Sequence, residues 1–192
     1  RGLAFMNSML MKHRQYDKHE NVRIMIPRSV VIATEYFDEF IRRNGLEYII
    51  SQDFSDEEVL SEFVSSTVPQ RLQQELKAYI RTVRTPLAVR SSSKLEDSHY
   101  QPFAGIYSTY MIPYADNEDQ MLRLLLRAVK SVYASVYFAA SRAYITTSQN
   151  LISEEKMAVI IQEVCGTEQN GLWFPTCSGV ARSINYYPIG DE

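Results

Sequence analysis

Residues 87–110 read LAVRSSSKLEDSHYQPFAGIYSTY and contain the polar residues on which the interpretation of the chain depends. The apolar run 87–89 predicts a short buried strand that ends directly before Arg90, and the alternating run 105–112 predicts another. A guanidinium at the end of a buried strand offers a planar fork of donors that matches phosphate or carboxylate oxygens. The segment therefore predicts a binding site for a polar, anionic group.

Further candidate site residues follow Arg90 in this segment. Ser91, Ser92 and Ser93 are expected to form a turn that adds hydroxyl and backbone donors. Gly105 stands where a strand is expected to begin, at a point where backbone can come close to a ligand. Because side chains alternate along a strand, Thr109 is expected on the same side as Gly105, so both could face one ligand.

A structural interpretation stays open on the residues alone. An Arg-Ser-Ser sequence after a strand is often a turn whose arginine pairs with a nearby acid. Glu96 and Asp97 suit the orientation of Arg90 or of another cation, but they also suit a solvated loop.

Composition sets the broad class of the protein. The 192 residues are 45% hydrophobic and 22% charged, with a formal net charge of −3. This is typical of a soluble protein with a real core, and it argues against a nucleic-acid or membrane-surface binder. Cys165 and Cys177 indicate reduced, buried or incidental thiols in a cytoplasmic protein, and the histidines lack metal-ligand spacing. Residues 1–192 are expected to be a single partial domain of a longer protein.

Periodicity predicts an α+β architecture with mixed sheets and flanking helices. Helices are expected at 3–11 and at 117–144. A third is expected to be capped by Thr34 and to end near Gly45, and a fourth to follow a capping box formed by Ser55 and Glu58. A fifth is expected to begin at Pro69 and to end before Pro86. Besides 87–89 and 105–112, strands are expected at 22–33 with a break or an edge at Pro27, at 157–164 and at 179–187. No internal repeat is evident.

Several of these residues together resemble a known family. The sequence AVRSS at 88–92, the pair Glu96-Asp97, the run FAG at 103–105 and the pair Thr109-Tyr110 are similar in type and spacing to the ATP-binding domain of phosphoenolpyruvate synthases and pyruvate phosphate dikinases. Rifampicin phosphotransferases and glucan, water dikinases share this domain. The segments IMIPRSVVIATEYFDEFI and MAVIIQEV resemble it more loosely. The resemblance implies the N-terminal portion of an ATP-grasp-like nucleotide-binding domain.

The resemblance also implies residue roles. Arg90 would contact the ATP phosphates and stabilise the transferring phosphoryl group, which makes it the candidate catalytic residue. Ser91, Gly105 and Thr109 would line the nucleotide pocket. The strand residues Gln162, Glu163 and Val164 would lie against adenine, with backbone groups of the last two reaching its edge. For Gln162, an ordinary polar residue on a strand face remains the alternative.

The implied function is the transfer of a phosphoryl group from ATP to a histidine on another domain, and then to pyruvate or a related acceptor. ATP and Mg²⁺ would be the cofactors. The family's phosphate-binding lysine and its metal-binding acids have no counterpart in this sequence, so the isolated chain is expected to be inactive. None of the three histidines is assigned the phosphocarrier role.

Departures from the family keep other functions open. Ser93-Lys94-Leu95 replaces the usual Ala-Thr-Ala, and Arg142 is displaced from the position of a family arginine. A non-catalytic regulatory or interaction domain is therefore the alternative, and a kinase for a different acceptor such as a drug or glucan is a third. Nucleotide and a phosphohistidine domain are the expected partners, and a homodimer stays open.

Overall fold

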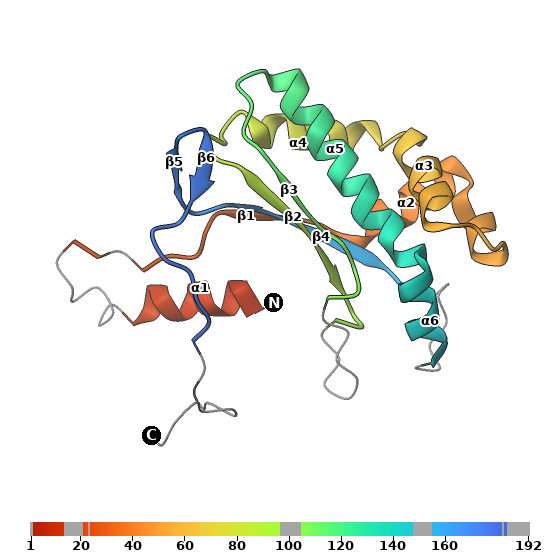
Figure 1. Ribbon diagram of the computed structural model, residues 1–192, viewed down its shortest axis with the longest axis horizontal. Helices are drawn as coiled ribbons and strands as arrows, with labels where there is room; N and C mark the ends of the chain where they lie inside the picture. The colour runs from red at the N-terminus through yellow and green to blue at the C-terminus, as the bar shows by residue number, and fades with distance from the viewer. Residues whose placement is uncertain are drawn as a thin grey trace.

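The computed structural model has a layer of helices packed over one face of a four-stranded antiparallel sheet (Figure 1). It describes residues 2–13, 21–22, 24–96, 105–147, 155–181 and 183. The α-helices are α1 (Gly2–Lys12), α2 (Thr34–Asn44), α3 (Asp56–Ser65), α4 (Gln70–Ile80), α5 (Glu118–Ala134) and α6 (Ala139–Thr147). Two 3₁₀ helices are η2 (Leu46–Ser51) and η3 (Ser135–Tyr137). The main-sheet strands are β1 (Ser29–Ile32), β2 (Leu87–Ser93), β3 (Thr109–Ile112) and β4 (Met157–Glu163).

The sheet has the order β1-β4-β2-β3, so β4 lies between two strands that precede it in the sequence. Every pairing among the described strands is antiparallel, so the prediction of mixed sheets is wrong for this part of the chain. The α+β class is confirmed. β1 is an edge strand that begins two residues after Pro27, as expected because proline cannot donate to a ladder.

One face of the sheet forms the core together with the helices, and we call it the covered face. Leu87, Val89, Val159 and Ile161 alternate along the two central strands and are fully buried. An aromatic cluster in the helical layer packs above them. Its closest pairs have ring centroids 5.1 to 5.7 Å apart and join Phe37, Phe40, Phe63, Tyr133 and Tyr137. The opposite face of the sheet carries no helical layer in Figure 1, and we call it the open face.

Local capping signals predicted several helix ends, but not the end of α4, which was expected just before Pro86 and lies at Ile80. Gly45 follows α2 in the left-handed conformation at φ 62°, and its N–H bonds the last carbonyls. Ser55 and Glu58 form the predicted capping box, with bonds of 3.2 and 2.8 Å. Thr34 was predicted as a cap, and this is wrong. The helix already includes Thr34, and Ala33 is the N-cap without a side-chain bond.

The predicted helix 117–144 is broken into three pieces. α5 ends at Ala134, η3 follows, and Phe138 is extended at ψ 154°. The break is stabilised from outside the helix, because the N–H of Ala139 donates to Asp56 Oδ1 at 2.7 Å. Arg142 in α6 donates to the carbonyls of Gln52 and Phe54, 3.2 and 2.8 Å away. These partners are distant in sequence, so helical periodicity could not reveal the break.

Two C-terminal features differ from expectation. A hairpin of β5 (Thr167–Gln169) and β6 (Leu172–Phe174) was not predicted. Its turn has Asn170 at φ 53° and Gly171 at φ 79°, as two-residue hairpins require. The predicted strand 179–187 lies mostly outside the described residues, and its described part forms no strand.

The predicted helix 3–11 is confirmed as α1, but it has no buried residue. Figure 1 draws it apart from the helical layer. Cys165 and Cys177 are free and exposed, which excludes the buried alternative. None of the described helices combines the length and apolar character that crossing a bilayer requires.

Candidate functional site

The open face is defined by the register of the four strands. Arg90 of β2 lies opposite Thr109 of β3 and Ile160 of β4, and Ile160 lies opposite Val31 of β1. Residues directly opposite one another in a sheet place their side chains on the same face. These four residues therefore form one row across the open face. The neighbouring row contains Ser29, Gln162, Ala88 and Met111.

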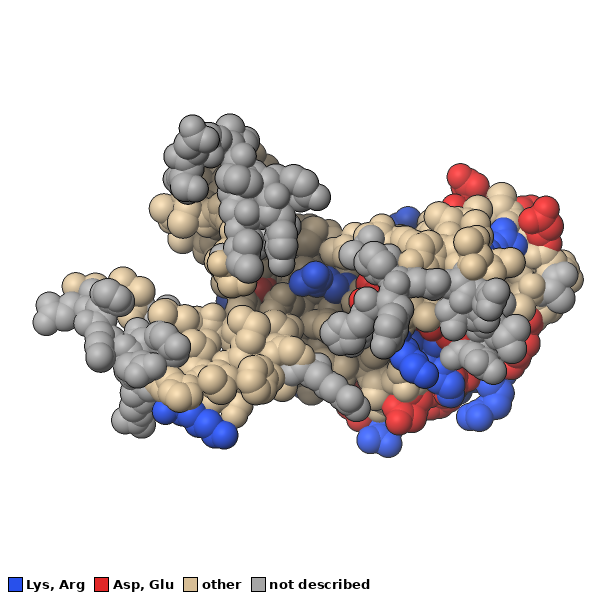
Figure 2. Space-filling view, turned by 90° about the horizontal axis from the view of Figure 1, so that it is seen from below, with Lys and Arg blue, Asp and Glu red and all other residues tan. Residues whose placement is uncertain are grey.

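The side chains of these rows are exposed or half-buried, in contrast to those of the covered face. Val31 and Met111 are 63% and 61% exposed. Figure 2, seen from below the view of Figure 1, shows a hollow that contains Lys or Arg atoms with Asp or Glu atoms close beside them. The rows on the open face thus combine apolar side chains with the exposed cation Arg90, a combination suited to a ligand with a flat apolar part and an anionic part.

Arg90 is the main candidate on this face. Its side chain is exposed, and among the described residues no carboxylate lies within ion-pair distance of it. Of the nearby acids with which Arg90 could pair, Glu96 bonds elsewhere, and Asp97 lies outside the described residues. An exposed guanidinium that no acid neutralises keeps its donors available for an anion.

Ser91 and Glu96 lie on the covered side of β2. Ser91 Oγ donates to Glu96 Oε1 at 2.9 Å, and the N–H of Ser93 donates to Glu96 Oε2 at 3.0 Å. The three serines do not form a turn, since β2 continues to Ser93 and alternation points Ser91 away from Arg90. The structure therefore does not bring Ser91 to the open face. Asp97 lies outside the described residues.

Gly105 and Thr109 are not related as predicted. β3 begins at Thr109, and Gly105 lies in a turn at φ +84°, a conformation that favours glycine. Strand alternation therefore does not apply between the two residues. Thr109 is exposed and lies opposite Arg90, whereas Gly105 is exposed in the segment that leads into β3.

The candidates at the end of β4 and directly after it do not share one face. Gln162 is on the open face, where its Nε2 donates to Ser29 Oγ at 3.0 Å. Glu163 points to the other side and forms a 2.7 Å ion pair with Arg28. The N–H groups of Glu163 and Val164 donate to the carbonyls of Arg28 and Pro86 at 3.0 and 2.9 Å. Both donors are thus used within the chain, and we assign neither of them an adenine contact.

A cluster that the sequence did not suggest lies at one end of the sheet. The hydroxyl of Tyr107 donates to Glu155 Oε1 at 2.9 Å, with the two residues 5% and 7% exposed. Burial raises the pKa of the Glu155 carboxyl above its ordinary value, although hydrogen bonds with Ser93 and Tyr107 partly oppose this. Burial also raises the pKa of Tyr107, and the negative charge of Glu155 raises it further. Nothing distinguishes Glu155 from its neighbour Glu154 in the sequence.

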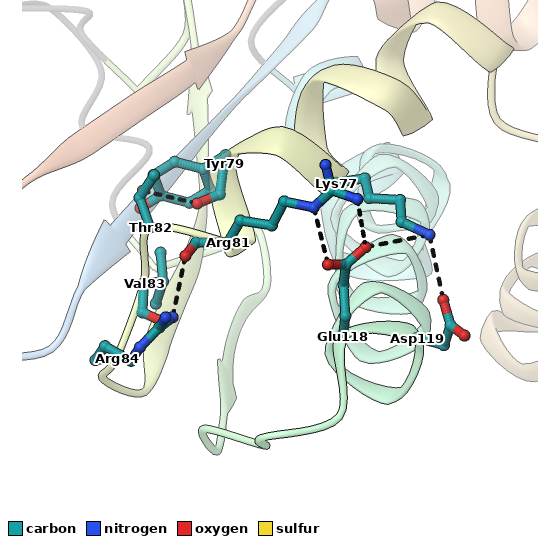
Figure 3. A network of polar contacts seen from close by, with 8 residues as sticks. All are labelled: Lys77, Tyr79, Arg81, Thr82, Val83, Arg84, Glu118 and Asp119. Carbon is teal, nitrogen blue, oxygen red and sulfur yellow. Dashed lines mark hydrogen bonds and ion pairs between the residues drawn. The ribbon is translucent and has the colours of Figure 1, made fainter.

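A second polar network joins α4 and α5 on the covered side, away from the candidates (Figure 3). Arg81 binds Glu118 through two bonds of 2.8 and 3.1 Å, and Lys77 lies 3.2 Å from Glu118. These cations, Arg81 first, lower the pKa of Glu118 to about 2. A cavity of about 330 Å³ beside Glu118 is lined by Arg84 and Asp116 among others. Because Lys77, Arg81 and Glu118 pair with each other, we interpret this network as a structural link between two helices.

No group of three or more His, Cys, Asp or Glu suited to a metal ion occurs within the described part of the chain. The residues brought together on the open face are Arg90, Thr109 and Gln162, from three neighbouring strands.

Comparison with known proteins agrees with this picture. The family model for the pyruvate phosphate dikinase AMP/ATP-binding domain matches residues 6–190. A Bacillus subtilis protein named uncharacterized phosphotransferase YvkC is 28% identical over 152 residues, which cover 78% of this chain and 17% of that protein. Phosphoenolpyruvate synthase of Aeropyrum pernix is 26% identical over 173 residues, which cover 79% and 20%. A probable phosphoenolpyruvate synthase of Staphylothermus marinus is 24% identical over 174 residues, with the same coverage.

The chain thus spans about a fifth of the length of these curated relatives. The resemblance in the sequence is confirmed, since the family model covers nearly the whole chain. The chain belongs to the family of pyruvate phosphate dikinase AMP/ATP-binding domains.

Proposed function

We propose that this chain is the ATP-binding part of a phosphotransferase similar to phosphoenolpyruvate synthases and pyruvate phosphate dikinases, with an ATP-grasp-like fold. The observation that carries the proposal is the exposure of Arg90 opposite Thr109. No described carboxylate neutralises this arginine. The open face would form the phosphate side of the nucleotide site. Gln162, in the next row, would lie toward the base.

Arg90 would act by holding the phosphate oxygens and by stabilising the charge of the phosphoryl group in transfer. Such reactions depend mainly on positioning and electrostatic stabilisation, so one well-placed arginine has a large effect. Mg²⁺ would accompany the ATP phosphates. The phosphoryl group would pass to a histidine on another domain of the complete protein, and then to pyruvate or a related acceptor.

Calorimetric titration of the complete protein with Mg-ATP tests the proposal. Arg90→Ala should weaken binding by about ten- to a hundredfold, because a hydrogen bond to a charged group contributes about 1.5–3 kcal/mol. Arg90→Lys should restore part of the affinity, since lysine keeps the charge but not the planar fork. The matched control is Arg123→Ala, which removes an exposed arginine from α5 on the covered side. Equal affinities for Arg90→Ala and Arg123→Ala would overturn the role of Arg90.

A non-catalytic nucleotide-binding or interaction domain is the second candidate. Arg142 favours it, because its guanidinium donates to the carbonyls of Gln52 and Phe54, as noted above. Incubation of the complete protein with labelled ATP distinguishes the two. An acid-labile, alkali-stable phosphoprotein would support transfer to histidine, whereas ATP binding without any labelled protein would favour the second candidate.

A further inference from the structure

The strand that carries Thr109 loses its backbone pairing just where the candidate site begins. The ladder between β2 and β3 runs from Leu87 and Ile112 to Arg90 and Thr109, which is its last pair. The ladder between β2 and β4 continues three residues further, to Ser93. Residues 105–108 therefore enter β3 without ladder bonds to β2, and Thr109 is the last residue of β3 that this ladder holds.

Two side chains hold this entering segment. The hydroxyl of Tyr107 donates to the carboxylate of Glu155 at 2.9 Å, and the N–H of Ser108 donates to Ser135 Oγ at 3.3 Å. Glu155 lies two residues before β4 begins. The bond between Tyr107 and Glu155 thus ties the start of β3 to the start of β4, across the end of β2.

The geometry favours a rigid connection. Tyr107 and Glu155 are nearly excluded from water, so a bond to the carboxylate is not weakened by competing solvent. The titratable groups that act on Glu155 are Tyr107, Glu96 and Lys94, and the Ser93 hydroxyl also bonds it. Ser93 is three residues beyond Arg90 on β2. The cluster therefore joins the ends of the three strands that carry Arg90, Thr109 and Gln162.

We propose that Tyr107 and Glu155 are positioning residues for nucleotide binding, whose hydrogen bond holds Thr109 opposite Arg90 on the open face. The proposal rests on the proposed function, because the open face must bind nucleotide for the position of Thr109 to matter. Neither residue touches the nucleotide. Their effect on affinity passes through the segment 105–108.

The test measures Mg-ATP affinity of the complete protein at one pH, at a temperature where circular dichroism shows every variant to be folded. Tyr107→Phe and Glu155→Met each remove the bond and should weaken binding about tenfold. Glu155→Gln keeps an oxygen acceptor and should retain affinity close to wild type. The double variant Tyr107→Phe/Glu155→Met should weaken binding by less than the sum of the two single effects, since both remove the bond between Tyr107 and Glu155.

A control separates positioning from general loss of stability. Val59→Ala deletes buried atoms in α3, remote from the sheet ends, and should destabilise the protein without changing ATP affinity. Amide hydrogen exchange provides a second readout. Tyr107→Phe should accelerate exchange in residues 109–112 and leave residues 56–65 unchanged.

The outcomes are distinguishable. If Arg90→Ala weakens binding but folded Tyr107→Phe binds ATP like wild type, the positioning proposal falls and the proposed function stands. If Arg90→Ala has no effect, the proposed function falls and the positioning proposal falls with it. If Tyr107→Phe does not fold, Glu155→Met decides in its place. It removes the acceptor of the Tyr107 hydroxyl, and unchanged affinity in the folded variant would overturn the proposal.

Discussion

Tyr133→Phe should stabilise this protein, although it alters a fully buried residue in the centre of the aromatic cluster. Tyr133 lies on α5 with 0% exposure, and its ring packs edge-on to Phe37 at a centroid distance of 5.1 Å. Its hydroxyl has no hydrogen-bond partner in the part of the chain that the structure describes. Burial raises the pKa of Tyr133 above its ordinary value of 10, as expected for a hydroxyl without a polar partner for its charged form.

The magnitude follows from two opposing contributions. A buried hydroxyl without a partner costs about 1–3 kcal/mol, which the substitution removes. The space left by one oxygen atom costs roughly 0.5 kcal/mol, at about 24 cal/mol per Å³ of cavity. The net gain is about 1 kcal/mol, which corresponds to a rise in Tm of about 2–4 °C for a protein of this size.

Tyr107→Phe is the matched comparison, because it makes the same chemical change with the opposite expected sign. The hydroxyl of Tyr107 donates to the buried Glu155, so its removal leaves a carboxylate with one donor fewer. The expected loss of stability is about 1–3 kcal/mol. Urea denaturation and thermal melts of the two variants and the wild type at pH 7 measure both effects. The reasoning is refuted if Tyr133→Phe lowers stability by as much as Tyr107→Phe.

Ser55→Ala, measured by urea denaturation, should lower stability by about 1 kcal/mol, because Ser55 caps α3; Ser61→Ala, exposed on the same helix, should have little effect. Glu118→Gln should remove part of the acid sensitivity. The pKa of Glu118 is lowered to about 2, chiefly by Arg81, so its stabilisation is present above pH 4.5 and is lost as pH falls toward 2. The difference between wild type and Glu118→Gln should also shrink at about 1 M salt, and a difference independent of both pH and salt would contradict the assignment.

Features that depend on neighbouring residues could be predicted from the sequence. Gly45 and the Ser55–Glu58 box ended or began helices because their bonds close within a few residues. The hairpin turn at Asn170-Gly171 belongs to this class too, although no hairpin was predicted there. The Asn-Gly pair is the strongest short hairpin signal.

Features that depend on distant partners could not be predicted. The break after α5 needs Asp56, which lies 83 residues from Ala139. The antiparallel order β1-β4-β2-β3 places β4 between strands that precede it, and no local pattern encodes that insertion. Of the candidate residues, Arg90 and Thr109 lie opposite one another, whereas Ser91 and Glu163 face the other way. Residue type suggested the candidates, but only the register could sort them by face.

The availability of Arg90 depends on how the nearby Glu96 is used. Glu96 is only six residues away and would neutralise Arg90 if both lay on the same side of β2. Instead, one Glu96 oxygen accepts from Ser91 Oγ and the other from the N–H of Ser93. Both serines lie on the covered side because side chains alternate along β2. The serines therefore hold the acid on one face while the arginine remains open on the other, so that an incoming anion meets an arginine that Glu96 does not neutralise.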